Sequence, residues 1–416
     1  MLNGMICTLA QASGGRAFSA DEVLSPYVYV FYAAFLIAWV FTPIMRSIAV
    51  YYGIVDRPDA RKIHSTPVAY LGGVAVFLGW VCGLAMSQFL FLHRNAPGLQ
   101  HVVVRVGIVA GACIIIALGL WDDLKKIRPA LKIAGQITAA CMLIASGIGT
   151  NITHHFLFPI VIRLGMYFDW APDPTVYSWF VFISSSALVI ATVVFCCNAT
   201  NLMDGLDGLC GGVTGIIAIG FVVLAVHLGM YSGGAEMNND ALRVVLGLAL
   251  LGGVLGFVPY NFNPASIFMG DTGSMFLGFT CALMILLVGE VAAKWFLAAM
   301  VMFALPILDT SLAFARRWVN NRPFFSADKH HFHHQLVARG MSVRKAVIFS
   351  YALAIFFVLC GTAIVFMRTR YAVAFYLVIF CSLIVAAYKM GMVHERPLTR
   401  LDTLTAEPQI HEEQVA

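Results

Sequence analysis

Charge is scarce in this chain. Asp, Glu, Lys and Arg make up 11% of its 416 residues, whereas hydrophobic residues make up 60%. A soluble domain typically has about 25% charged and about 45–50% apolar residues. The composition therefore excludes a soluble globular protein, a disordered chain and a small disulfide scaffold. It predicts an all-α protein that crosses a bilayer many times.

Cysteine motifs and targeting signals are also missing. The ten Cys form no CxxC pair and no Cys–His spacing typical of zinc sites, so we expect small buried side chains. The first 25 residues lack a basic segment followed by a long apolar run, so no cleaved signal peptide is predicted.

Long apolar runs are abundant. A run of about 20 apolar residues crosses the hydrocarbon core as one helix. We count eleven, at about residues 27–50, 70–92, 103–121, 132–150, 177–197, 210–230, 242–260, 267–289, 294–313, 346–367 and 371–390. The segment 151–176 has room for a small re-entrant or surface element. The chain thus divides into an N-terminal extracytoplasmic segment (1–26), a transmembrane domain (27–392) and a polar cytoplasmic tail (393–416), which we expect to be disordered.

Basic residues are distributed unequally between the two faces. If the loop after the first run is inside, 18 of the 26 Lys and Arg residues lie inside and 8 lie outside. Lys and Arg favour the cytoplasmic side of a membrane protein. We therefore expect the N-terminus outside and the C-terminus in the cytoplasm.

Acidic residues avoid the centres of the apolar runs, whereas ion-coupled transporters place charged groups near the midplane. The nine acids of the predicted cytoplasmic loops before the tail are all aspartates: Asp56, Asp59, Asp122, Asp123, Asp204, Asp207, Asp271, Asp309 and Asp328. Short carboxylates at helix ends suit a hard cation such as Mg²⁺. The alternative is that they only anchor the spans at the interface.

Asp122 and Asp123 form the first of five polar motifs on this face. They follow an apolar run directly and precede Lys125. Adjacent carboxylates repel each other unless a cation lies between them, so the pair favours a metal or a phosphate-bound metal. A solvated helix end is the alternative.

The second motif extends from Asn198 to Gly208 and has a polar residue at every third position: Asn198, Asn201, Asp204 and Asp207. Three residues turn by about 300° in a straight helix, so the first and last of these groups would face apart. Gly205 and Gly208 predict a break in the helix, which would let the polar groups converge on a ligand.

The third motif joins Asn261, Phe262 and Asn263 to a glycine turn around Asp271. Asp271 opens the next helix, whose free N–H groups favour anions. A metal-bridged phosphate would satisfy both the carboxylate and these N–H groups, and an ordinary N-cap is the alternative.

The fourth motif is the run Asp328-Lys329-His330-His331-Phe332-His333-His334. No Cys lies nearby, and adjacent His on a regular helix cannot all reach one tetrahedral centre, so zinc is not expected. Imidazoles that donate to a diphosphate fit better, with a generic basic patch as the alternative.

The fifth motif, residues 55–64, contains Arg61, Lys62 and His64 among turn formers. It has the donors to close over a nucleotide or a headgroup, and a membrane-anchoring loop is equally compatible. Together the five motifs supply Asp oxygens, basic donors and glycine turns, which are the components of metal-assisted phosphoryl transfer.

In this order the motifs resemble those of the polyprenyl-phosphate N-acetylhexosamine-1-phosphate transferases, glycosyltransferase family 4. The resemblance extends from about Val55 to Gly340. It rests on Val55-Asp56-x-Pro58, Arg61-Lys62-x-His64, Asp122-Asp123, Asn201-x-x-Asp204-Gly205-x-Asp207-Gly208, Gly270-Asp271-x-Gly273-Ser274 and His331-x-His333-His334. The HxHH form after Asp328 is similar to the aminosugar branch of the family.

The resemblance implies an enzyme of the bacterial inner (plasma) membrane with its active site at the cytoplasmic face. Undecaprenyl phosphate, or another polyprenyl phosphate, would attack the β-phosphate of a UDP-N-acetylhexosamine such as UDP-GlcNAc and release UMP. This would begin a cell-surface polysaccharide such as O-antigen lipopolysaccharide or teichoic acid. Mg²⁺ is the implied cofactor, with Mn²⁺ as its substitute. We expect a homodimer in the lipid bilayer and no nucleic-acid partner.

The resemblance also implies residue roles. The implied catalytic residues are Asp122, Asp123, Asp204, Asp207 and Asp271, and the implied metal ligands are Asp271, Asp122 and Asp207. The implied substrate-binding residues are Arg61, Lys62, His64, Lys125, Lys132, Asn198, Asn201, Phe262, Asn263, His331, His333 and His334. Two alternatives stay open: a phospho-MurNAc-pentapeptide translocase, and a transporter for a nucleotide sugar or lipid carrier.

Overall fold

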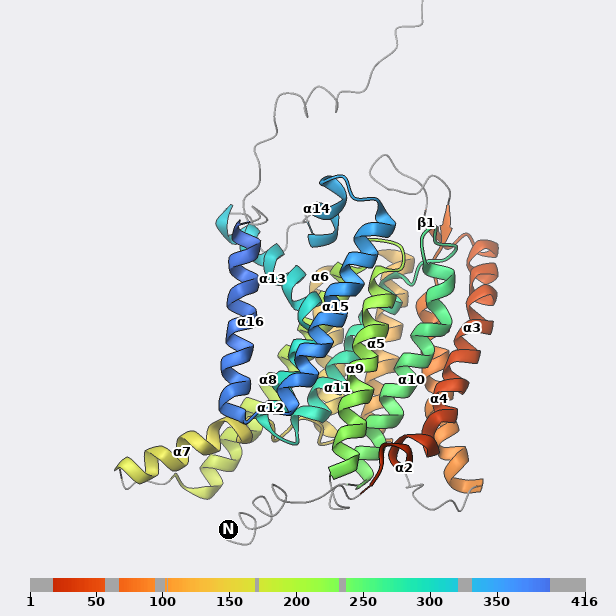
Figure 1. Cartoon of the computed structure of the whole chain (residues 1–416). Coiled ribbons are helices and arrows are strands. Elements are labelled where there is room, and N and C mark those ends of the chain that lie inside the picture. Colours follow the sequence, from red (N-terminus) through yellow and green to blue (C-terminus); the bar gives the residue numbers. More distant parts are fainter. Residues whose placement is uncertain are drawn as a thin grey trace, which may run out of the picture.

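The computed structural model describes residues 18–56, 67–93, 102, 104–168, 172–231, 237–320 and 331–389. Apart from one two-stranded hairpin, the described elements are helices packed side by side (Figure 1). They are α2 (Ala20–Leu24), the 3₁₀ turn η1 (Ser25–Tyr27), α3 (Val28–Tyr51), α4 (Gly72–His93), α5 (Val106–Lys125), α6 (Pro129–Ala145), α7 (His154–Phe168), α8 (Pro174–Met203), α9 (Leu209–Tyr231), α10 (Met237–Asn261), α11 (Gly270–Gly289), α12 (Ala293–Met302), α13 (Ala304–Val319), α14 (Phe332–Ala338), α15 (Val343–Val365) and α16 (Thr369–Lys389).

The predicted all-α polytopic membrane protein is confirmed. Within the described residues, eight helices are long and apolar enough to cross a bilayer, and the bent pair α12–α13 would make a ninth. The predicted runs 132–150 and 371–390 correspond to shorter apolar helices, Pro129–Ala145 and Thr369–Val385. The number eleven stays a prediction.

Helix α11 lies at the centre of the bundle and packs against α4, α5, α8 and α12 (Figure 1). Every residue of α11 except Asp271 is buried. A helix that is apolar on all sides is typical of the core of a membrane bundle. The exception is therefore informative, because it places a carboxylate at the N-terminal end of the most enclosed helix.

Glycines let the helices approach α11 closely. A Cβ on Gly119 of α5 would lie 2.4 Å from the Thr272 Cα, and one on Gly278 would lie 2.4 Å from the Cys196 carbonyl oxygen of α8. Small residues allow such close backbone packing in membranes. The contact at Gly119 brings the C-terminal end of α5 onto the N-terminus of α11.

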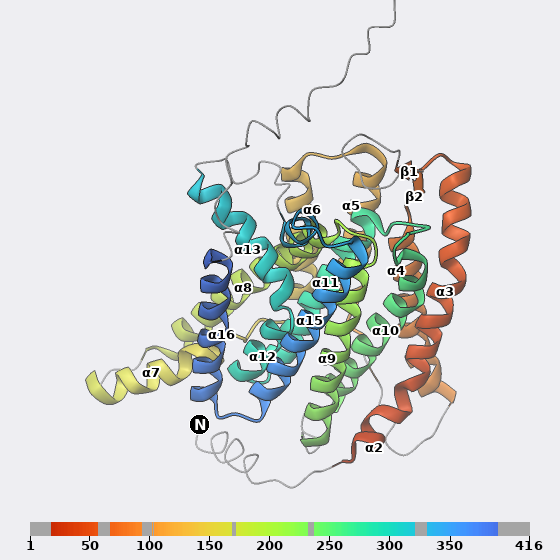
Figure 2. The same cartoon turned by 45° about the horizontal axis from the view of Figure 1, so that its top comes forward.

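The predicted single span 294–313 is divided at Phe303 into α12 and α13, whose axes differ by 74°. Pro306 falls in the first turn of α13 and has no N–H to donate to the Met302 carbonyl, so a straight continuation of α12 would lose a hydrogen bond. After the bend, α13 runs obliquely toward the end of the bundle that carries α14 (Figure 2).

The two ends of the described chain lie at opposite ends of the bundle. Helix α2 lies at one end, and α16 finishes at the other, which also carries the hairpin, α14 and the α5–α6 connection (Figure 1). This arrangement agrees with termini on opposite faces, and the assignment of the cytoplasmic face stays a prediction. The predicted surface element in 151–176 is confirmed as α7, which projects from the bundle at the α2 end (Figure 1).

A short hairpin orders the segment that precedes α11. Strands β1 (Val55–Asp56) and β2 (Val68–Ala69) pair antiparallel, and Ala69 forms a parallel bridge to Ile267. The Phe268 N–H donates to the Ala69 carbonyl at 2.8 Å, and the Gly72 N–H donates to the Phe268 carbonyl at 3.0 Å. The hairpin therefore ties the entry of α11 to the start of α4.

Candidate active site

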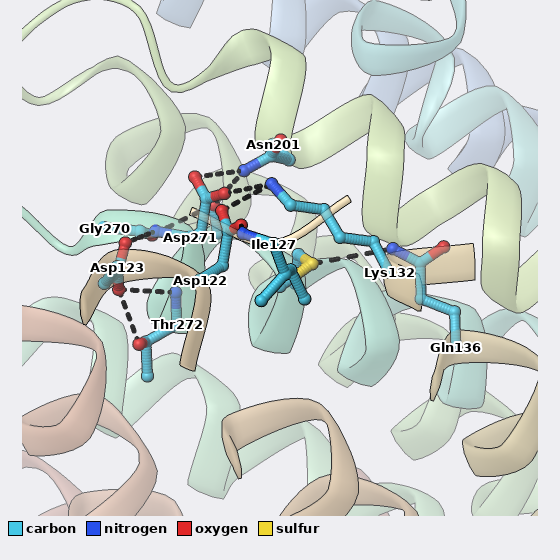
Figure 3. A network of polar contacts seen from close by, with 11 residues as sticks. Asp122, Asp123, Ile127, Lys132, Gln136, Asn201, Gly270, Asp271 and Thr272 are labelled. Atoms are coloured by element: carbon cyan, nitrogen blue, oxygen red, sulfur yellow. Dashed lines mark hydrogen bonds and ion pairs between the residues drawn. The ribbon is translucent and has the colours of Figure 1, made fainter. Parts of the chain in front are cut away.

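Two predicted carboxylates and a lysine meet at the N-terminus of α11. The Lys132 ammonium of α6 lies 2.6 Å from Asp122 Oδ2 of α5 and 2.5 Å from Asp271 Oδ2 of α11 (Figure 3). The side chains of Lys132 and Asp271 are 21% and 29% exposed, and that of Asp122 is 10% exposed. Three separate segments thus build one polar cluster that solvent can reach.

Asp123 faces a different way from its neighbour. Its Oδ1 accepts the Asp271 N–H at 2.8 Å, and its Oδ2 accepts the Thr272 N–H at 3.0 Å and the Thr272 hydroxyl at 2.6 Å (Figure 3). The first N–H groups of a helix have no partner within the helix. Asp123 supplies that partner from α5, and so it fixes the position of Asp271.

Gly270 makes room for this cap. It has φ +69°, a left-handed conformation that favours glycine, and a Cβ there would lie 2.5 Å from Asp123 Oδ2. Gly270 therefore has two functions: it adopts the left-handed turn, and it lets Asp123 of α5 come close to the start of α11. The predicted N-cap function at this position is provided by a residue distant in sequence.

Helix α8 continues beyond its predicted apolar run and brings the predicted Asn pair to the cluster. Asn201 Nδ2 donates to Asp271 Oδ1 at 2.8 Å and to Ser274 Oγ at 3.0 Å. Asn198, about one turn deeper, donates to Gln136 Oε1 at 2.8 Å. These partners satisfy the amides, which explains why the helix extends through Asn198 to Met203.

The predicted helix break after Met203 is confirmed, because α9 begins only at Leu209. Asp204 lies in this turn. Burial and the nearby charges of Asp271, Asp123 and Asp207 raise the pKa of the Asp204 carboxyl to about 8. Asp204 therefore belongs electrostatically to the α11 cluster.

Asp207 is held by the third motif. Its Oδ2 accepts the Asn263 amide and the Ala265 N–H, each at 3.0 Å. A Cβ on Gly208 would lie 3.1 Å from the Phe262 ring, so this loop packs against the turn after Asp204. In this arrangement Asp207 orders the 262–266 loop, and its role as a metal ligand stays a prediction.

The histidine motif approaches the same turn. His331 and His333 are buried, and His334 is half-buried. A Cβ on Gly205 would lie 2.4 Å from His333 Nε2 and 3.2 Å from His334 Nε2. The fourth motif therefore contacts the second motif, as expected if both bind one ligand.

Other predicted residues are not placed in the cluster. Lys125 is exposed at the end of α5. Arg61, Lys62 and His64 lie outside the described residues, as do Asp59 and Asp328.

Two side chains of this region were missed as site residues. Tyr70 follows β2, and burial together with the carboxylates of Asp56 and Asp123 raises its pKa. Asp309 is buried in α13 beside His331 and His333. Asp309 was counted only among the aspartates of the cytoplasmic loops, although it lies near the end of the predicted run 294–313, and that position was the available signal. An isolated Tyr gave no signal.

The oxygen donors of the cluster suit a hard cation. Asp122 and Asp271 already share one cationic group, the Lys132 ammonium, and Mg²⁺ prefers one or two carboxylates completed by phosphate oxygens and water. Among the described residues, no group of three or more His, Cys, Asp or Glu side chains is arranged to hold a metal ion. Asp122 and Asp271 thus supply the one or two carboxylates that Mg²⁺ takes when phosphate oxygens and water complete its coordination.

Comparison with known proteins agrees with the arrangement of motifs. Residues 105–289 match the family model described as "Glycosyl transferase family 4". The chain is 32% identical, over 91% of its length and 97% of the relative's, to a protein of Bacillus subtilis named "Probable undecaprenyl-phosphate N-acetylglucosaminyl 1-phosphate transferase". It is 33% identical, over 76% of its length and 77% of the relative's, to the "Decaprenyl-phosphate N-acetylglucosaminephosphotransferase" of Mycolicibacterium smegmatis.

A second group of relatives carries a different name. The chain is 31% identical to the "Phospho-N-acetylmuramoyl-pentapeptide-transferase" of Desulforudis audaxviator, over 59% of its length and 71% of the relative's.

Fold, site and relatives together define a multi-pass membrane enzyme that transfers a sugar phosphate. The chain belongs to glycosyl transferase family 4, in the group of polyprenyl-phosphate N-acetylhexosamine-1-phosphate transferases, as its motifs predicted.

Proposed function

We propose that the protein transfers N-acetylglucosamine 1-phosphate from UDP-GlcNAc to undecaprenyl phosphate, or another polyprenyl phosphate, in the bacterial inner membrane. The observation that carries this proposal is the convergence of Asp122, Lys132, Asn201 and Asp271 at one end of the bundle. Each comes from a different helix, and the cluster lies where a helix N-terminus meets partly exposed carboxylates.

In the proposed reaction, a phosphate oxygen of the lipid attacks the β-phosphorus of UDP-GlcNAc. The bond from the β-phosphorus to the bridging oxygen breaks, and UMP leaves with the electron pair. A phosphomonoester has a second pKa of about 6, so the acceptor is mostly a dianion at neutral pH. It hardly needs a general base, and we favour direct attack over a covalent aspartyl phosphate.

The main work of the protein is then positioning and charge neutralisation. Asp271 and Asp122 would hold Mg²⁺, and the bound ion would neutralise charge on the transferring phosphoryl group. Asp123 keeps Asp271 in place through the cap on α11. Lys132 offsets the repulsion between Asp122 and Asp271 before substrate binds, and it is well placed to contact a phosphate afterwards.

The relatives support GlcNAc as the donor sugar. Two relatives named for GlcNAc transfer match 91% and 76% of the chain at 32% and 33% identity. Two muramoyl-pentapeptide transferases match 59% and 77% at 31% and 30% identity, so the support for GlcNAc comes from the relative that matches 91% of the chain. The HxHH motif points in the same direction. Both proposed substrates carry phosphate groups. A site at one end of the bundle is therefore accessible to the lipid phosphate and to the nucleotide.

The test is a donor panel on purified protein in detergent or nanodiscs with Mg²⁺ and undecaprenyl phosphate. UMP release and the mass of the lipid product are recorded for UDP-GlcNAc, UDP-GalNAc and UDP-MurNAc-pentapeptide. We expect UMP and a lipid diphosphate bearing N-acetylhexosamine with UDP-GlcNAc. UMP formed only with UDP-MurNAc-pentapeptide would identify the muramyl branch. Exchange of labelled substrate across liposomes without UMP would indicate a transporter.

A further inference from the structure

Asp309 lies where no motif assigned a function. It sits on α13, after the bend at Phe303, and is 2% exposed. Its Oδ1 accepts the Phe332 N–H at 2.7 Å, which fixes the first turn of α14. A buried carboxylate is costly unless it is paired, so its surroundings carry information about its purpose.

Both buried histidines of the HxHH motif turn the same ring atom toward this carboxylate. His331 Nδ1 lies 3.4 Å from Asp309 Oδ1, and His333 Nδ1 lies 3.4 Å from Asp309 Oδ2. Their rings are stacked almost in parallel, with centroids 5.6 Å apart. These contacts are longer than ordinary hydrogen bonds, and neither Asp309 Oδ2 nor His331 Nδ1 has a hydrogen-bond partner among the described residues. At this separation the carboxylate attracts an imidazole electrostatically once that imidazole is protonated.

The opposite ring atom of His333 faces the site. His333 is 1% exposed, and its Nε2 has no hydrogen-bond partner among the described residues. His333 Nε2 lies against Gly205, the residue that follows Asp204. A Cβ built on Gly205 would be only 2.4 Å from this nitrogen. A buried ring nitrogen without a partner is expensive, so a ligand at this turn would supply what the protein does not.

We propose that Asp309 is a positioning residue for the HxHH motif. It holds the Nδ1 side of His331 and His333, so that His333 Nε2 is presented toward the Asp204–Gly205 turn as a donor to the diphosphate of the sugar nucleotide. The carboxylate also balances the positive charge of an imidazolium beside a phosphate, as the partner of a histidine does in other enzymes. This inference rests on the proposed function for the identity of the ligand.

A double-mutant cycle tests the link between the two residues. Asp309→Asn alone should lower kcat/KM for UDP-GlcNAc by about 10- to 100-fold, the usual effect of losing a partner that orients an imidazole. The KM for undecaprenyl phosphate should stay within about twofold, because the effect acts on the donor site. In a His333→Ala background the same change should cost less than about threefold, since Asp309 acts through His333. Asp309→Glu, which keeps the charge, should recover part of the loss.

A matched control separates positioning from stability. Asp240→Asn removes another buried carboxylate, at the far end of the bundle, and should lower thermal stability without changing kcat/KM of the folded enzyme. Additive losses in the double mutant, or Asp309→Asn activity within about twofold of wild type, would overturn the proposal.

A readout without turnover keeps this test separate from that of the proposed function. Diethylpyrocarbonate modification of His333, followed by peptide mass spectrometry, should be several-fold faster in Asp309→Asn than in wild type. An unchanged rate would contradict positioning by Asp309. If wild type formed no UMP with any donor, the proposed function would fail, and the modification rates would still decide whether Asp309 holds the ring.

Discussion

The two ends of α11 carry charge clusters of opposite character. At the C-terminal end, the Arg243 guanidinium lies 2.6 Å from Asp240 and donates to the Leu287 carbonyl at 2.9 Å. Arg243 and Asp240 side chains are 0% and 7% exposed. At the N-terminal end, Asp271 and Lys132 stay 29% and 21% exposed.

The difference follows from what each cluster has to do. The Arg243 pair is enclosed, with a cation at the negative end of the helix dipole, and it satisfies a carbonyl that α11 leaves open. The Asp271 cluster collects more carboxylates than its one described bridging ammonium can balance, at the positive end of the same helix. A closed pair stabilises the fold, whereas an accessible and incompletely balanced cluster is suited to binding.

The largest contrast should come from neutralising one aspartate at each end. Asp271→Asn should reduce UMP release by at least about 100-fold, because it removes a carboxylate proposed to hold the Mg²⁺ that neutralises charge on the transferring phosphoryl group. Asp240→Asn should leave turnover unchanged and cost about 3–5 kcal/mol of stability, because Arg243 loses a buried partner. UMP release and thermal unfolding are measured on both variants. Asp271→Asn activity above about a tenth of wild type would remove Asp271 from the metal site.

Asp123→Asn should fall between these extremes and affect both properties. It disturbs the cap that accepts two N–H groups and a hydroxyl at the start of α11. We expect a loss of about 1–2 kcal/mol in stability and, through the displaced Asp271, about tenfold in kcat. Unfolding curves and kcat are compared with those of wild type. An unchanged melting temperature with a complete loss of activity would instead make Asp123 a direct catalytic residue.

Lys132→Met tests whether the Lys132 ammonium and Mg²⁺ compete for the carboxylates of Asp122 and Asp271. Without the ammonium, Asp122 and Asp271 should attract Mg²⁺ more strongly, and the half-saturating Mg²⁺ concentration should fall by about fivefold, equivalent to about 1 kcal/mol. The saturated rate should also fall, because a phosphate contact is lost. Lys126→Met removes a nearby exposed charge and serves as the control. Weaker Mg²⁺ activation in Lys132→Met would show that Lys132 does not compete with the metal.

The last prediction concerns the pH dependence of stability that Asp204 contributes. Its folded pKa of about 8 lies above the ordinary value of an Asp, so the folded protein holds a proton that the unfolded chain releases. This stabilisation is present below about pH 4 and is lost as the pH rises through about 8. The melting temperature of wild type without divalent cations should therefore fall from about pH 5 to about pH 8 more steeply than that of Asp204→Asn. Parallel curves would contradict the assignment.

Composition predicted the class of fold, and the motifs contain the residues that the structure brings together at the N-terminus of α11, because both depend on local chemistry. Apolar runs located the spans, and glycines near Asp204 located the break between α8 and α9. The bend at Phe303 was missed because Pro306 lies inside an apolar run whose hydropathy alone indicates one span.

The division of labour within the site depended on tertiary contacts. The adjacent residues Asp122 and Asp123 look equivalent in sequence, yet one contacts Lys132 and the other caps α11. Likewise Asp207 belongs to the same motif as Asp204 but contacts the loop around Asn263. Such differences arise from the approach of helices distant in sequence, which no local pattern specifies.

Binding of Mn²⁺, followed by electron paramagnetic resonance in the presence of UDP-GlcNAc, tests the central claim most directly. If Asp122 and Asp271 share one ion with the donor diphosphate, the protein should bind about one equivalent per chain, and Asp122→Asn and Asp271→Asn should each lose it. Asp240→Asn should retain it. Undiminished Mn²⁺ binding in both Asp122→Asn and Asp271→Asn would contradict a shared site at the N-terminus of α11.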